Sequence, residues 1–141
     1  VFSSDSTLAL TASRDGTARI WSTDTGECLR TLVGHGEGVS MAVFSQCGSL
    51  VLTASSDLTA KIWSADSGQC LHTLRGHGLR VCSAEFSPDG TLALTACEDR
   101  TARIWRADTG ECIHTLRGHG DAVFSAAFSP TRALVLTASR D

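Results

Sequence analysis

Histidine, threonine and aspartate, which together can do chemistry, recur in this 141-residue sequence with one fixed spacing. A hydroxyl, an imidazole and a carboxylate within hydrogen-bonding reach can form a nucleophilic relay, and histidine with aspartate can also bind a metal ion. The repeated positions lie 42 residues apart and include a tryptophan: His35, His77 and His119; Thr11, Thr53, Thr95 and Thr137; Asp15, Asp57, Asp99 and Asp141; Trp21, Trp63 and Trp105. An active site is seldom copied in every repeat, whereas a packing device must be, so the repetition favours a structural role.

A second motif matches the aspartic-protease signature in its letters. The sequence reads DTG at 24–26, DSG at 66–68 and DTG at 108–110. Protease chemistry needs two carboxylates that share a proton at close range. These three copies fall in equivalent turns of separate units, so we expect no protease activity.

Six cysteines could indicate disulfides or a metal site: Cys28, Cys47, Cys70, Cys82, Cys97 and Cys112. No Cys-x-x-Cys motif occurs, and three of the six occupy equivalent positions in different units, too far apart to bridge. We therefore expect free thiols, no metal and no cofactor. Six unpaired thiols also favour a reducing compartment, the cytoplasm or the nucleus.

The composition excludes several classes of protein. Apolar residues make up 42 % of the chain and charged residues 19 %, which is typical of a folded soluble protein. The formal net charge is −3 and the basic residues are scattered, so we expect no nucleic-acid partner. No apolar stretch is long enough for a membrane span. We expect one domain over residues 1–141, and because the sequence starts at Val1 we expect that its natural N-terminus is missing.

The elements that must position the repeated residues are short strands. In the second unit we expect strands over 39–45, 50–55, 59–64 and 69–74, separated by Gly, Asp and Ser at the turns. No apolar set recurs with helical spacing, so helices are not expected. The second strand of each unit, for example Leu50-Val51-Leu52, is apolar on both faces. Such a strand belongs to a sheet that is covered on both sides, as in small sheets stacked around an axis.

The segment 76–105, which reads GHGLRV…FSPDGTLALTACEDRTARIW, closely resembles the WD-repeat β-propeller family. The resemblance covers the whole chain in about 3.4 repeats of 42 residues. It implies an all-β partial propeller of tandem four-stranded antiparallel blades, an open arc of about three blades plus a partial one. The Asp that follows Trp in the family is Ser22, Ser64 or Arg106 here, at a strand end where the change affects the fold little.

The resemblance also assigns the recurring polar residues to one hydrogen-bonded chain inside each blade. The Trp indole donates to the Thr hydroxyl, the hydroxyl to His, and His to the Asp carboxylate. Two sets are complete, His35/Thr53/Asp57/Trp63 and His77/Thr95/Asp99/Trp105. The first unit lacks its His, and the last unit lacks its Trp. Both end units contain the segment LTASRD, at 10–15 and 136–141. We therefore expect an arc cut from a longer ring.

Residues that differ between units on the loop face are the candidates for partner binding. They are Arg14, Ser56, Glu98 and Arg140 before the turn aspartates, and Glu37, Ser40, Leu79, Arg80, Cys82, Asp121 and Phe124 around the start of the innermost strand. In the family, the position after that strand's first Val often lines the channel and holds a peptide side chain, which here implies Ser40, Cys82 and Phe124. Phe124 either contacts a partner or packs half-buried against a neighbouring blade.

The leading hypothesis is a non-catalytic scaffold that binds peptides or domains on its loop face and at the channel entrance. The alternative is a ligand-sensing repeat region of a larger NACHT-type signalling NTPase, because the units are unusually alike. The chain contains no phosphate-binding G-x-x-x-x-G-K-[ST] motif, so that catalytic domain would lie outside it. Open blade edges also predict self-association between copies.

Overall fold

The computed structural model describes residues 1–131 and 134–141, and strands account for its regular structure. The strands are β1 (Leu8–Ala12), β2 (Thr17–Ser22), β3 (Cys28–Val33), β4 (Val39–Phe44), β5 (Leu50–Ser55), β6 (Ala60–Ser64), β7 (Cys70–Leu74), β8 (Val81–Phe86), β9 (Leu92–Cys97), β10 (Ala102–Arg106), β11 (Cys112–Leu116), β12 (Val123–Phe128) and β13 (Val135–Ser139). None of the described residues is helical. In particular, the described residues contain no helix that could cross a membrane.

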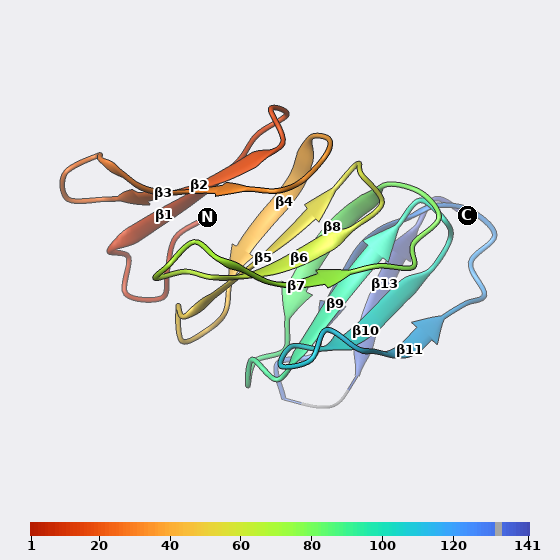
Figure 1. The fold of residues 1–141 in the computed structure, drawn as a ribbon. Helices are drawn as coiled ribbons and strands as arrows, with labels where there is room; N and C mark the ends of the chain where they lie inside the picture. Colours follow the sequence, from red (N-terminus) through yellow and green to blue (C-terminus); the bar gives the residue numbers. More distant parts are fainter. Residues whose placement is uncertain (132–133) are drawn as a thin grey trace.

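The strands form successive antiparallel sheets arranged as blades along an open arc (Figure 1). The second blade has the order β4-β5-β6-β7 and the third has β8 to β11 in the same sequence, so each is a four-stranded meander. The first sheet contains β1-β2-β3, and the last described sheet contains β12 and β13. The strands β4, β8 and β12 lie next to one another on the inner side of the arc. The all-β partial propeller with four-stranded blades is confirmed, and the sheets do not close into a ring.

Several strand ends differ from the expected ones by a single residue, because turn side chains bind the backbone there. The expected strand 39–45 ends at Phe44, since the Ser45 hydroxyl accepts the Leu50 N–H at 3.0 Å inside the turn. The expected strand 59–64 begins at Ala60, because Thr59 is bound to the preceding turn. The expected strand 69–74 begins at Cys70.

The core lies between the blades. The second strands of the two complete blades are buried on both faces, and Leu52 of β5 and Leu94 of β9 are both 0 % exposed. One apolar cluster joins Leu52 and Ile62 of the second blade to Trp105 of the third. The continuous apolar pattern of these strands therefore reflects packing against a neighbouring blade on each side.

One turn in each repeat requires a left-handed backbone: the turn between β1 and β2, and its equivalents between β5 and β6 and between β9 and β10. In the first unit Gly16 supplies it with φ of +83°, and a Cβ there would lie 3.3 Å from the carbonyl oxygens of His35 and Glu37. The other units place Leu58 and Arg100 at the same position, each with φ of +67°. Non-glycine residues seldom adopt this conformation, so the turn needs other support, which the aspartates before them provide.

Candidate functional site

The second blade contains a continuous hydrogen-bonded chain that starts at a buried tryptophan. The indole Nε1–H of Trp63 on β6 donates to Thr53 Oγ1 on β5 at 2.9 Å. The same hydroxyl lies 2.7 Å from Nε2 of His35, and Nδ1 of that ring lies 2.8 Å from Oδ2 of Asp57. The third blade repeats the chain in Trp105, Thr95, His77 and Asp99 with distances of 2.9, 2.8 and 2.9 Å. The two complete sets predicted from the sequence thus form the same chain in space.

Burial fixes the charge states along this chain. The His35 side chain is 1 % exposed, and its burial lowers the pKa of the imidazole, so the ring is neutral near pH 7. A neutral ring that accepts the Thr53 proton at Nε2 donates its Nδ1–H to the carboxylate. Burial alone would raise the pKa of Asp57, but hydrogen bonds from the Thr59 hydroxyl and the Gly36 N–H hold that pKa at about 2. Because the neutral imidazole bonds to a hydroxyl on one side and to a carboxylate on the other, each polar group of this hydrogen-bonded chain has a partner.

The end sheets contain only part of the chain. In the first sheet Trp21 Nε1–H donates to Thr11 Oγ1 at 2.9 Å, next to Asp15 in the following turn. In the last sheet His119 lies 2.8 Å from Thr137 Oγ1 and 3.2 Å from Asp141 Oδ1. These end residues are more exposed than their counterparts in the complete blades.

One group in the third blade brings together three side chains that can bind metal ions. His77, Cys97 and Asp99 each offer a ligand atom, and these atoms lie within 4.8 Å of one another. Burial raises the pKa of the Cys97 thiol to about 12, and Sγ donates to the Leu79 carbonyl oxygen at 3.2 Å. Ser55 occupies the same place in the second blade and binds the equivalent carbonyl of Glu37 at 3.2 Å. Cys97 therefore acts as a serine equivalent that supports the turn.

Two members of this polar cluster escaped the sequence reasoning. The hydroxyl of Thr59 donates to Asp57 Oδ1 at 2.7 Å, and Thr101 makes the same bond to Asp99. A threonine follows the turn aspartate by two residues in the first three units, as DGT, DLT and DRT, which is the signal that could have found them. With these bonds the aspartate also stabilises the left-handed turn.

The three residues that follow the first Val of each inner strand occupy β-bulges. The strand register shifts between Val39 and Met41, between Val81 and Ser83, and between Val123 and Ser125. The skipped residues are Ser40, Cys82 and Phe124. A bulge leaves its extra residue outside the ladder and redirects its side chain. Of the three, Ser40 lines a hollow on the surface and Phe124 is exposed.

Five of the eleven candidate partner-binding residues line one polar hollow of about 450 Å³: Arg14, Glu37, Ser40, Ser56 and Arg80. They come from three successive sheets: Arg14 follows β1, Glu37 and Ser40 lie at the start of β4, Ser56 follows β5, and Arg80 precedes β8. The Arg80 Nε–H donates to Ser40 Oγ at 3.0 Å, which ties the third blade to the second across the hollow. The hollow thus combines two guanidinium groups with one carboxylate and two hydroxyls.

The other six candidates lie outside this hollow: Leu79, Cys82, Glu98, Asp121, Phe124 and Arg140. Cys82 Sγ lies 4.0 Å from Glu98 Oε1, and burial together with this carboxylate raises the pKa of the thiol. Phe124 is 48 % exposed at its bulge, which is compatible with both the contact to a partner and the half-buried packing expected from the sequence. The structure therefore brings five of the candidates together in one charged hollow, and the other six do not line it.

The family comparison agrees with this geometry. The family model described as WD domain, G-beta repeat matches residues 1–22, 26–64, 68–106 and 110–141. None of the curated proteins compared with the chain matches it. Repeats of this kind generally mediate protein–protein interaction, and the proteins that contain them are typically non-catalytic scaffolds.

Proposed function

Because the chain belongs to the WD-repeat family, we propose that it is a non-catalytic scaffold that binds an extended peptide segment at the rim of the arc. The hydroxyl, imidazole and carboxylate that could form a relay are hydrogen-bonded to one another inside the blade. The His35 side chain is 1 % exposed, and both of its ring nitrogens are bonded. A relay without access to substrate supports no chemistry. Recognition therefore falls to the rim residues that differ between blades.

The polar hollow supports a particular class of peptide. Arg14 and Arg80 place two guanidinium groups at its edge, and only Glu37 opposes them among the lining residues. A guanidinium group presents a rigid fork of donors that fits a carboxylate. The bond from Arg80 to Ser40 fixes one of these forks before a ligand arrives, which lowers the entropy lost on binding. We expect a peptide with an acidic side chain in this hollow.

The single observation that carries the proposal is the convergence of Arg14, Ser40 and Arg80 from three sheets on one hollow. A library of displayed peptides, selected on the immobilised chain, tests it. We expect the selected peptides to be enriched in Asp and Glu. Arg80→Ala and Arg14→Ala should each weaken their binding about tenfold or more without lowering the melting temperature, because both side chains are exposed.

Arg75→Ala is the matched control, since Arg75 is also exposed but lies after the outermost strand β7. Peptides that bind the Arg14→Ala, Arg80→Ala double variant as tightly as the parent would refute the proposed site. The NACHT-type alternative and the cytoplasmic or nuclear location stay predictions.

A further inference from the structure

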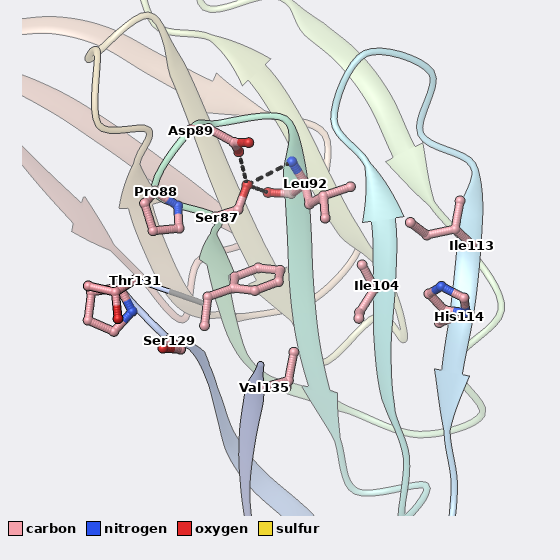
Figure 2. A pocket seen from close by; sticks show the side chains of 12 residues that line it. Ser87, Pro88, Asp89, Leu92, Ile104, Ile113, His114, Ser129, Thr131 and Val135 are labelled. Atoms are coloured by element: carbon pink, nitrogen blue, oxygen red, sulfur yellow. Dashed lines mark hydrogen bonds between the residues drawn. The ribbon is translucent and has the colours of Figure 1, made fainter. Parts of the chain in front are cut away.

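Several charged side chains of the chain are bonded within their own turn. Asp15 pairs with Arg19 at 3.5 Å across the turn between β1 and β2. Figure 2 shows a second case at an apolar hollow of about 480 Å³ beside the third blade, where the Ser87 hydroxyl donates to the Asp89 carboxylate at 2.6 Å. These charges stabilise the turns that contain them, so a ligand would first have to break those bonds.

Three charged side chains near the polar hollow differ from these: Arg14, Arg80 and Glu98. Within residues 1–131 and 134–141, none of the three forms an ion pair. Arg14 and Arg80 are exposed and Glu98 is half-buried, so all three can be reached from the solvent. Two positive charges and one negative charge are therefore available to a ligand at this place.

Arg80 and Glu98 carry opposite charges and are neighbours in the backbone. The Glu98 N–H donates to the Arg80 carbonyl oxygen at 3.0 Å. Their side chains nevertheless go to different blades. The Arg80 Nε–H donates to Ser40 Oγ at the bulge of β4 in the second blade, at 3.0 Å. Glu98 Oε1 lies 4.0 Å from Sγ of Cys82, at the equivalent bulge of β8 in the third blade.

We propose that Ser40 holds Arg80 away from Glu98, so that the chain recognises a peptide segment with one acidic and one basic side chain. The inference rests on the proposed function, because the acidic side chain of the segment enters the hollow between Arg14 and Arg80. The basic side chain pairs with Glu98 at the next bulge along the arc. Ser40 is thus a positioning residue, which keeps two opposite charges from neutralising each other before a ligand binds.

The spacing of the two side chains follows from the blade architecture. Ser40 and Cys82 occupy equivalent bulges on β4 and β8, the inner strands of neighbouring blades. Packed sheets lie about 10 Å apart, and an extended chain rises about 3.3 Å per residue. A segment that crosses from one bulge to the next therefore places its acidic and basic side chains about two to four residues apart.

The same arrangement discriminates against a segment that is acidic throughout. A second acidic side chain at the position of the basic one would face the Glu98 carboxylate, and like charges repel. A segment with an apolar residue there would leave Glu98 without a partner but would cause no repulsion. We therefore expect the order of affinity at this position to be basic, then apolar, then acidic.

A synthetic peptide array, probed with the fluorescently labelled chain, tests this order. Each peptide has a fixed Glu in a Gly/Ser background and carries Lys, Ala or Glu at one of the neighbouring positions on either side. We expect Lys to bind about threefold or more tightly than Ala at an offset of about two to four residues, and Glu to bind most weakly there. Glu98→Lys should reverse this order. Glu111→Gln is the matched control, because Glu111 is exposed in the distant turn before β11 and should leave the order unchanged.

A double-mutant cycle tests the role of Ser40, with the Glu/Ala peptide as the probe. Ser40→Ala removes the bond that holds Arg80, so Arg80 pairs with Glu98, and we expect the peptide to bind about tenfold more weakly. Ser40→Thr keeps the hydroxyl and should retain the affinity. In a Glu98→Gln background Arg80 has no carboxylate to pair with, so Ser40→Ala should then have a much smaller effect.

The outcomes separate this inference from the proposed function. Glu peptides that lose binding in the Arg14→Ala, Arg80→Ala double variant but gain nothing from Lys at any offset would overturn the inference and leave the acidic-peptide site standing. The same holds if Ser40→Ala weakens binding equally with and without Glu98. Glu peptides that bind the parent no better than the Gly/Ser background would refute the proposed function, and this inference with it.

Discussion

Replacing Asp57 with alanine tests whether the buried hydrogen-bonded chain stabilises its blade. The Asp57 carboxylate accepts hydrogen bonds from His35 Nδ1–H at 2.8 Å, from the Gly36 N–H at 2.9 Å and from Thr59 Oγ1 at 2.7 Å. The aspartate side chain is 15 % exposed and the His35 side chain is 1 % exposed. Alanine removes the acceptor and leaves the imidazole N–H buried without a partner.

The expected loss follows from what water can reach. A buried donor left unpaired costs about 1–3 kcal/mol, and water cannot rescue His35 because its ring is covered. Gly36 is exposed, so water replaces most of its bond, while the lost bond to Thr59 adds about 1 kcal/mol. We therefore expect Asp57→Ala to lower the free energy of unfolding by about 2–4 kcal/mol. This loss is a large part of the total stability of a small domain.

Urea unfolding monitored by tryptophan fluorescence measures this loss, and the chain offers a matched control. Asp141 makes the equivalent contact to His119, but the two side chains are 42 % and 32 % exposed. Water can replace that bond, so Asp141→Ala should leave the urea midpoint close to that of the parent. If Asp57→Ala unfolds at the same urea concentration as the parent, or costs no more than Asp141→Ala, the stabilising role assigned to the buried chain is refuted.

Two further predictions concern titration. Burial lowers the pKa of His35 and His77 in the folded state below the ordinary histidine pKa of 6.5. At a pH below about 6.5 the unfolded state therefore binds more protons than the folded state. Stability should be full above about pH 6.5 and should fall with decreasing pH, with a further loss between about pH 4 and 2 as Asp57 is protonated; a urea midpoint that rises from pH 7.5 to 5.5 would contradict this. Hydrogen bonds from Ser45 and Ser49 lower the pKa of the exposed Cys47 thiol to about 7, whereas burial raises that of Cys97 to about 12. Iodoacetamide at pH 7 followed by peptide mass spectrometry should therefore modify Cys47 much faster than Cys97, and equal rates would show that the turn does not stabilise the thiolate.

The sequence by itself determined the blade and its internal chain. The 42-residue period, the paired apolar faces of strands such as Leu50–Ser55 and the invariant His, Thr, Asp and Trp depend on contacts within one unit or between adjacent units. Such contacts repeat whenever the sequence repeats, so the 42-residue period of the sequence predicts the repetition of the blades. The bonds of Thr59 and Thr101 were missed although the same period marks their positions.

Tertiary structure alone decided which rim residues meet. Arg14, Ser40 and Arg80 lie in different units, and nothing in their types indicates that one hollow collects them. The tertiary structure also decided that Leu136 is 73 % exposed while Leu52, at the equivalent position of an identical LVLTAS segment, is 0 % exposed. Burial in this fold is a property of the neighbouring blade, which the residues of a single repeat do not encode.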